Sequence, residues 1–191
     1  MVFNIPTNNY FRLKGVRLKD KIILLQCYFI AGINYFFNRK KFVTVGQFLM
    51  KDILVKDENG IIFQARAISE DLGYIAGNTK PETKRWFMPK NGEIVIDVGA
   101  AIGKFSLLAA KKGAYVISIE PHPLTYNALM KNIELNSFKN IRALNVAAGK
   151  EEGKAELYSP KNYFGRASLK NHWENKFDKV KYIVDIVTLD S

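Results

Sequence analysis

The feature that most constrains this 191-residue chain is an alternation of short apolar runs and amphipathic stretches between residues 93 and 146. Residues 93–98 and 115–119 are rich in β-branched side chains, which is typical of strands buried in a parallel sheet, on both faces for 93–98, and residues 141–146 predict a third strand. Residues 104–112 and 124–136 carry apolar side chains at helical spacing. Two strand-helix-strand units in succession predict a right-handed parallel sheet, so we expect an α/β, Rossmann-like fold.

Less regular segments surround this core. Residues 21–50 predict one or two helices, and two apolar runs around Asp57-Glu58-Asn59-Gly60 predict a β-hairpin. A short helix is expected at 68–76, with Ser69 as its N-cap, and another at 81–87. The chain therefore divides into a basic and apolar helical leader (1–50), a segment with a hairpin and helices (51–90) and a core segment (91–191), where 156–158 and 182–189 are also strand-like.

Basic residues exceed acidic ones by 29 to 18, which gives a net charge of +11 and suggests a polyanionic neighbour. Residues 1–60 hold ten basic and four acidic residues, and these basic residues bracket an uncharged apolar stretch, 22–38. Three interpretations stay open for this stretch: a helix packed on the domain, an amphipathic helix lying in the plane of an anionic membrane surface, or a membrane span. Its 17 residues lie at the lower limit for a span.

Two acidic side chains stand near the carboxyl ends of the first two predicted strands, where open α/β sheets bind ligands. Asp97 belongs to the run Asp97-Val98-Gly99-Ala100-Ala101-Ile102-Gly103, and Glu120 ends the second strand before Pro121. Glycines in such a turn let the backbone approach a ligand closely. A carboxylate at the second strand end can accept two hydrogen bonds from ribose hydroxyls, so the pattern predicts a nucleoside site.

The turn distinguishes between two nucleoside cofactors. A dinucleotide site needs G-x-G-x-x-G, and counted from Gly99 this chain has Ala101 and Lys104 at the later glycine positions. Asp97 would repel a pyrophosphate but attract an ammonium or sulfonium group. S-adenosyl-L-methionine carries both cations and no phosphate, so the sequence favours this cofactor over NAD.

Residues 93–136, EIVIDVGAAIGKFSLLAAKKGAYVISIEPHPLTYNALMKNIELN, resemble the FkbM-type S-adenosylmethionine-dependent methyltransferases. The runs at 145–149 and 187–190 extend the resemblance over residues 90–191. It implies a class I methyltransferase sheet of seven strands, of which this chain holds the N-terminal, cofactor-binding half (β-α-β-α-β). It also implies a cofactor-binding set, in which the acidic end of the first strand and the glycine turn line the methionine portion, Glu120 the ribose, and the later residues the ribose or adenine edge: Asp97, Gly99, Ala100, Ala101, Gly103, Glu120, Pro121, His122, Asn145 and Ala147.

The family pattern continues beyond Leu189-Asp190 with a helix and a further strand, whereas this chain ends at Ser191. In that fold the first strand has a neighbour on each side, so an unpaired strand at 93–98 would expose an apolar edge. We therefore expect either that the chain is a C-terminally truncated piece of a longer protein, or that residues 182–189 or a partner chain cover this edge.

The resemblance implies methylation of a hydroxyl on a sugar, a glycan or another small molecule. Two alternatives stay open: an RNA methyltransferase, and a cofactor-binding fragment or subunit without catalysis. Nucleic acid is not the expected partner, because the basic residues cluster around an apolar segment and not around aromatic side chains suited to base stacking.

No catalytic residue is assigned. His122 is the nearest candidate for a base, whereas the polar surroundings of His172 are typical of a surface histidine. No His, Asp or Glu cluster has the spacing of metal ligands, so no metal is expected. The single cysteine, Cys27, favours a reducing, cytoplasmic setting, with peripheral membrane contact if the stretch 22–38 lies on a bilayer.

Overall fold

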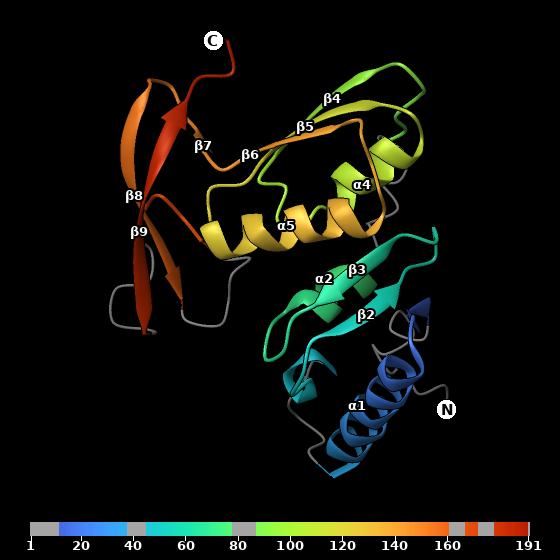
Figure 1. Cartoon of the computed structure of the whole chain (residues 1–191). Helices are drawn as coiled ribbons and strands as arrows, with labels where there is room; N and C mark the ends of the chain where they lie inside the picture. Colours follow the sequence, from blue (N-terminus) through green and yellow to red (C-terminus); the bar gives the residue numbers. More distant parts are fainter. Residues whose placement is uncertain (1–11, 38–44, 78–86, 161–166, 172–177, 191) are drawn as a thin grey trace. The chain divides into compact units, whose positions relative to one another are not determined.

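The computed structural model describes residues 12–37, 45–77, 87–160, 167–171 and 178–190 (Figure 1). The chain divides into two compact units, Met1–Phe87 and Met88–Ser191. The helix predicted at 81–87 and His172 fall outside the described residues, apart from Phe87. The three-part division of the sequence stays a prediction.

The first unit contains a three-stranded antiparallel sheet in the order β1-β2-β3. Its elements are β1 (Lys14–Gly15), α1 (Leu18–Phe37), the 3-10 helix η2 (Val45–Phe48), β2 (Ile53–Lys56), β3 (Ile62–Ala65) and α2 (Asp71–Ala76). The predicted hairpin is confirmed: Gly60 adopts φ +76° in its turn, and Asp57 N–H donates to the Ile61 carbonyl at 3.0 Å. A two-residue strand such as β1 has no periodicity, so the sequence analysis missed it.

The alternation of buried and exposed side chains along β2 and β3 explains the core of this unit. Ile53, Val55 and Phe63 are fully buried, while their neighbours along β2 and β3 are partly or fully exposed. One side of α1 is also buried, through Leu24, Cys27 and Ala31 at helical spacing. A helix is thus confirmed over residues 22–37, and its buried side packs within its own unit. Burial raises the pKa of the Cys27 thiol. Within the described residues, no helix is long and apolar enough to cross a membrane.

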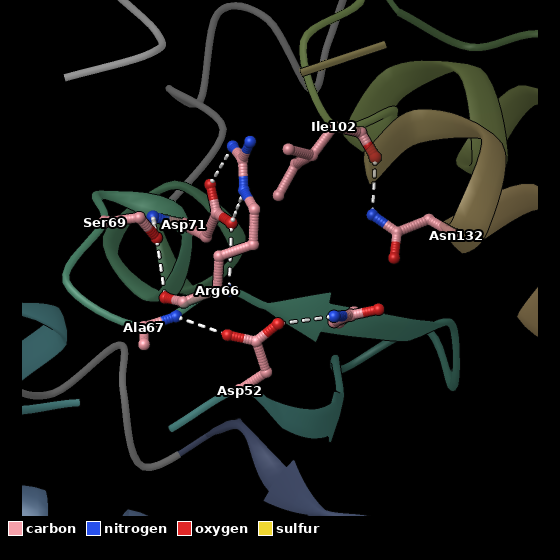
Figure 2. Close-up of polar contacts among 8 residues, drawn as sticks. Asp52, Arg66, Ala67, Ser69, Asp71, Ile102 and Asn132 are labelled. Carbon is pink, nitrogen blue, oxygen red and sulfur yellow. Dashed lines mark hydrogen bonds and ion pairs between the residues drawn. The ribbon is translucent and has the colours of Figure 1, made fainter. Parts of the chain in front are cut away.

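An ion pair fixes the entry to α2 (Figure 2). The Asp71 carboxylate accepts hydrogen bonds from Arg66 Nε at 2.7 Å, Arg66 Nη2 at 2.9 Å and the Arg66 backbone N–H at 3.1 Å. Ser69, the predicted N-cap, accepts from Asp71 N–H at 3.2 Å. The helix begins at Asp71, however, and Glu70 holds the N-cap position without a side-chain hydrogen bond, so the predicted boundary at 68 was too early.

The second unit confirms the β-α-β-α-β prediction. Its elements are β4 (Ile94–Val98), α4 (Lys104–Lys111), β5 (Tyr115–Ile119), α5 (Pro123–Leu135), β6 (Ile141–Leu144), β7 (Ala147–Ala148), β8 (Gly153–Pro160) and β9 (Lys179–Val187). The strands β4, β5 and β6 pair in parallel in that order, and α4 and α5 lie on the same face of this sheet (Figure 1). The third strand ends at Leu144, two residues earlier than predicted, because the chain then enters a second sheet of order β7-β9-β8.

One prediction about β4 was wrong. Ile94, Ile96 and Val98 are 73%, 50% and 52% exposed, so this strand is not buried on both faces. Asp97, which alternates with them along the strand, bonds Ser106 of α4, so these side chains lie on the opposite face of the sheet. Among the described strands, β4 pairs with β5 alone. The predicted strand at 182–189 forms part of β9, which pairs with β7 and β8 and not with β4. It therefore does not cover the apolar edge.

Candidate cofactor site

The turn after β4 is held by backbone hydrogen bonds that it donates to the end of β5. The N–H groups of Gly99 and Ala100 both donate to the Ile119 carbonyl, at 2.8 and 3.0 Å. Gly99, Ala101 and Gly103 adopt φ values of +78°, +50° and +93°. Ala101 carries a Cβ in this left-handed conformation, which costs roughly 1–2 kcal/mol and makes the turn a strained segment.

The two glycines of the turn are needed for different reasons. A Cβ on Gly103 would lie 2.5 Å from Cδ1 of both Leu107 and Leu129, so this glycine permits the packing of α4 against α5. A Cβ on Gly99 would meet no atom within 4 Å. Gly99 thus presents open backbone at the carboxyl edge of the sheet, where a ligand can approach closely.

Glu120 ties the two strand ends together. Its Oε2 accepts the N–H of Ala101 at 2.8 Å, and its Oε1 accepts the N–H of His122 at 2.9 Å. The side chain is 6% exposed. Each carboxylate oxygen has two lone pairs and can accept more than one hydrogen bond, so this group is chemically suited to a ribose hydroxyl. The structure therefore places Glu120 directly beside the glycine turn, as the sequence analysis expected.

Asp97 begins a buried series of hydrogen bonds that was not predicted from the sequence. Ser118 Oγ donates to Ser106 Oγ at 2.7 Å, and Ser106 Oγ donates to Asp97 Oδ2 at 2.6 Å. Both serines are fully buried. Burial raises the pKa of the Asp97 carboxyl, although the hydrogen bonds from Ser106 oppose this shift. The serines orient Asp97 toward α4. The one sign of these hydrogen bonds in the sequence is Ser118, a polar residue inside the otherwise apolar run of β5.

His122 and Pro121 belong to the turn that leads into α5. The His122 side chain is fully buried, and its ring packs against Tyr182 of β9 with centroids 4.8 Å apart. This burial favours a structural role over the role of an acceptor-side base considered from the sequence. Pro121 is half-buried and contributes its carbonyl to a contact with Asn145.

Asn145 closes the site from the end of β6. Its Nδ2 donates to the carbonyl oxygens of Glu120 at 2.8 Å and of Pro121 at 3.1 Å. Ala147, two residues later, is buried in β7 opposite Ile186. The predicted residues at the ends of β4, β5 and β6 are therefore brought together, whereas Ala147 and the His122 ring pack into the protein.

Asn132 is a second residue that the sequence analysis missed. It lies on α5, is fully buried, and donates from Nδ2 to the Ile102 carbonyl at 2.9 Å (Figure 2). This bond holds the glycine turn from the helix side. In sequence it is one asparagine in a helical pattern, with nothing to reveal a partner 30 residues away.

The geometry suits a nucleoside with a cationic amino-acid tail. Open backbone at Gly99, the Glu120 carboxylate and the Asp97 carboxylate lie at adjacent strand ends, as S-adenosylmethionine requires. Among the described residues, no group of three or more His, Cys, Asp or Glu side chains could hold a metal ion.

Comparison with known proteins decides the family. Residues 54–156 match the model of the TRM5/TYW2 methyltransferase domain, and this match covers more than half of the chain. The chain belongs to the TRM5/TYW2 methyltransferase family. A class I, S-adenosylmethionine-dependent methyltransferase assignment is therefore confirmed, but the narrower FkbM resemblance is not supported. Residues 93–136 carry the glycine turn and strand-end acid of the shared fold, so they could not separate the two families.

Relatives of this TRM5/TYW2 domain act on tRNA by name. The chain is 30% identical over 134 residues to a tRNA (guanine(37)-N(1))-methyltransferase of Aedes aegypti, covering 66% of this chain and 22% of that protein. It is 36% identical over 67 residues to a tRNA(Phe) (4-demethylwyosine(37)-C(7)) aminocarboxypropyltransferase of Methanocaldococcus jannaschii, covering 34% and 27%. The expectation that nucleic acid is not a partner finds no support in these names.

A solved structure also matches: TYW2 of P. horikoshii in complex with MeSAdo, at 30% identity and a TM-score of 0.40, covering 51% of this chain and 37% of that one. The chain spans about a quarter of the length of the two curated relatives described above.

Proposed function

We propose that this chain binds S-adenosylmethionine at the carboxyl ends of β4, β5 and β6 and serves an RNA methyltransferase whose substrate is tRNA. The observation that carries the proposal is the hydrogen-bonded junction of Ala101 and Glu120, which places the strained glycine turn beside a carboxylate at the next strand end. Gly99 and Glu120 would hold the cofactor, and the cofactor would supply the methyl group. Membership of the TRM5/TYW2 family supports this assignment.

The chain's own residues position this chemistry. Methyl transfer is an in-line displacement at the sulfonium carbon, so alignment of acceptor and methyl group supplies much of the rate. Asn145 and Asn132 hold the turns on either side of the site through backbone carbonyls, and Glu120 joins these turns to each other. Rigid support of this kind keeps a bound cofactor in one orientation.

A tRNA acceptor is supported by the names of the relatives and by charge. Residues 1–87 carry 14 basic and 7 acidic residues, and residues 88–191 carry 15 and 11. A basic excess of this size favours association with phosphate backbones. The name of the Aedes aegypti relative points to N1 of guanine 37 as the acceptor atom, and the Methanocaldococcus jannaschii relative also modifies position 37 by name. None of the relatives above supports a sugar hydroxyl as the acceptor.

The test is incubation of the protein with methyl-tritiated S-adenosylmethionine and two tRNA transcripts that differ only by guanine or adenine at position 37. We expect label in the guanine transcript alone. Label in a saccharide acceptor and in neither RNA would contradict the proposed substrate. Photo-crosslinking of the labelled cofactor to the protein, measured without RNA, reports cofactor binding separately from transfer.

A further inference from the structure

The side of α1 that faces away from the core of its own unit is apolar. Large hydrophobic side chains recur along it at spacings of three and four residues and are all exposed: Leu18, Ile22, Leu25, Phe29 and Ile33. At 3.6 residues per turn they fall within about 80° of arc. We call these five residues the apolar face of α1.

This face is separate from the packing of the helix. The buried side consists of Asp20, Leu24, Cys27 and Ala31, which lie opposite the apolar face around the helix. Leu25 and Phe29 remain 65% and 71% exposed. A contiguous exposed stripe of this kind is typical of an interaction surface, since it adds nothing to the core.

Charge indicates what this surface meets. Lys19 and Lys21 are exposed and lie about 80° to either side of the middle of the apolar face. The only acidic residue of α1 is Asp20, which is buried and bound by Arg17 Nε at 2.7 Å. No charged residue occurs from 22 to 38, and Arg39, Lys40 and Lys41 follow in sequence. Cations therefore border both ends of an uncharged apolar stretch.

We propose that the apolar face of α1 lies in the plane of an anionic membrane surface. The hydrophobic side chains would enter the boundary between headgroups and acyl chains, and the bordering lysines would contact lipid phosphates. The 20-residue helix extends about 30 Å along the surface. A second copy of the chain fits less well, because its α1 would bring the same lysines and no exposed carboxylate to pair with them.

RNA also fits this face less well. Phosphate contacts need cations along the binding surface, whereas more than four turns of α1 carry none. The proposal is independent of the proposed tRNA substrate, because it concerns only the first unit and needs no cofactor.

Flotation with lipid vesicles tests the proposal. The whole protein is mixed with vesicles of phosphatidylcholine alone, or of phosphatidylcholine with phosphatidylglycerol, at low salt. We expect flotation with the anionic vesicles only. Leu25→Glu or Phe29→Glu should lower the bound-to-free ratio about tenfold or more, since each removes an exposed apolar side chain that the bilayer would bury. The double variant Lys19→Glu, Lys21→Glu should lower it by at least about fivefold per charge removed.

The matched control is Met50→Glu, which places the same charge on another exposed apolar residue of this unit and should float as wild type does. Circular dichroism verifies that the variants keep their helix content. If Leu25→Glu or Phe29→Glu unfolds, the double variant Lys19→Glu, Lys21→Glu still tests the proposal. Equal flotation on both vesicle types, no flotation, or flotation unchanged by Leu25→Glu would overturn the proposal. So would a solution dimer that Phe29→Glu dissociates, which would assign the face to a second copy.

Discussion

At the scale of single residues, the two glycines of the turn separate folding from binding. Gly103→Ala should lower the free energy of unfolding by about 3 kcal/mol, because its Cβ overlaps two buried leucines and φ is +93°. Gly99→Ala should lower it by only about 1 kcal/mol, because strain at φ +78° is the single penalty. Urea unfolding measures both.

In calorimetry with S-adenosylmethionine we expect the reverse order, with Gly99→Ala weakening cofactor binding more than Gly103→Ala. A Cβ on Gly99 occupies the open backbone that we assign to the cofactor, so Gly99→Ala should weaken binding more than its small effect on stability suggests. Binding by Gly99→Ala at wild-type affinity would remove this glycine from the site.

Asp97 gives a pH-dependent prediction. Its pKa is raised in the folded state by burial, so its contribution to stability is fully present below the unfolded pKa of about 3.9 and is lost as pH rises through the folded value. Asp97→Asn removes this loss and keeps an acceptor for Ser106. The variant should therefore be more stable than wild type at neutral pH, with the difference shrinking toward pH 3, as urea unfolding at several pH values would measure.

The same variant should bind S-adenosylmethionine more weakly, since the carboxylate charge is absent. A variant that is less stable than wild type at neutral pH would contradict the assigned cause of the pKa shift.

At the scale of elements, the ion pair at the start of α2 differs from those on the surface. Asp71→Asn should lower the free energy of unfolding by about 3 kcal/mol, because it removes the charge of a carboxylate that binds the largely buried Arg66 guanidinium. Glu58→Gln, which removes the acid of the exposed pair with Arg12 in the same unit, is the control and should stay within about 0.5 kcal/mol of wild type. Equal losses in thermal or urea unfolding would contradict this difference.

Periodicity predicted the long elements well and their surroundings poorly. The helices α4 and α5, the hairpin and the parallel strands follow from local pattern, and the clustering of Gly99, Glu120 and Asn145 follows from parallel topology. The exposure of Ile96 does not follow from local pattern, because an apolar run shows what a strand is able to bury but not which neighbouring elements are present to cover it. Hydrogen bonds between residues far apart in sequence, such as that from Asn132 to Ile102, have no local signature.

At the scale of the whole molecule, net charge predicts how the proposed tRNA complex would respond to salt. Neutralised phosphates release counterions, so affinity for a tRNA transcript should fall at least about tenfold between 50 and 200 mM salt. Affinity for S-adenosylmethionine should change little over this range, which makes it the control. Filter binding measures the first and calorimetry the second. A flat salt dependence for tRNA would contradict phosphate contacts as the basis of recognition.

The central claim is that the ends of β4 and β5 form a cofactor site around Glu120. Isothermal titration of the protein with S-adenosylmethionine tests it most directly, together with Glu120→Gln and with Glu93→Gln, an exposed acid just before the other end of β4. We predict one equivalent bound by wild type and by Glu93→Gln, and an affinity at least about tenfold lower for Glu120→Gln, which loses a charged acceptor. No binding by wild type, or equal affinity in all three proteins, would contradict the claim.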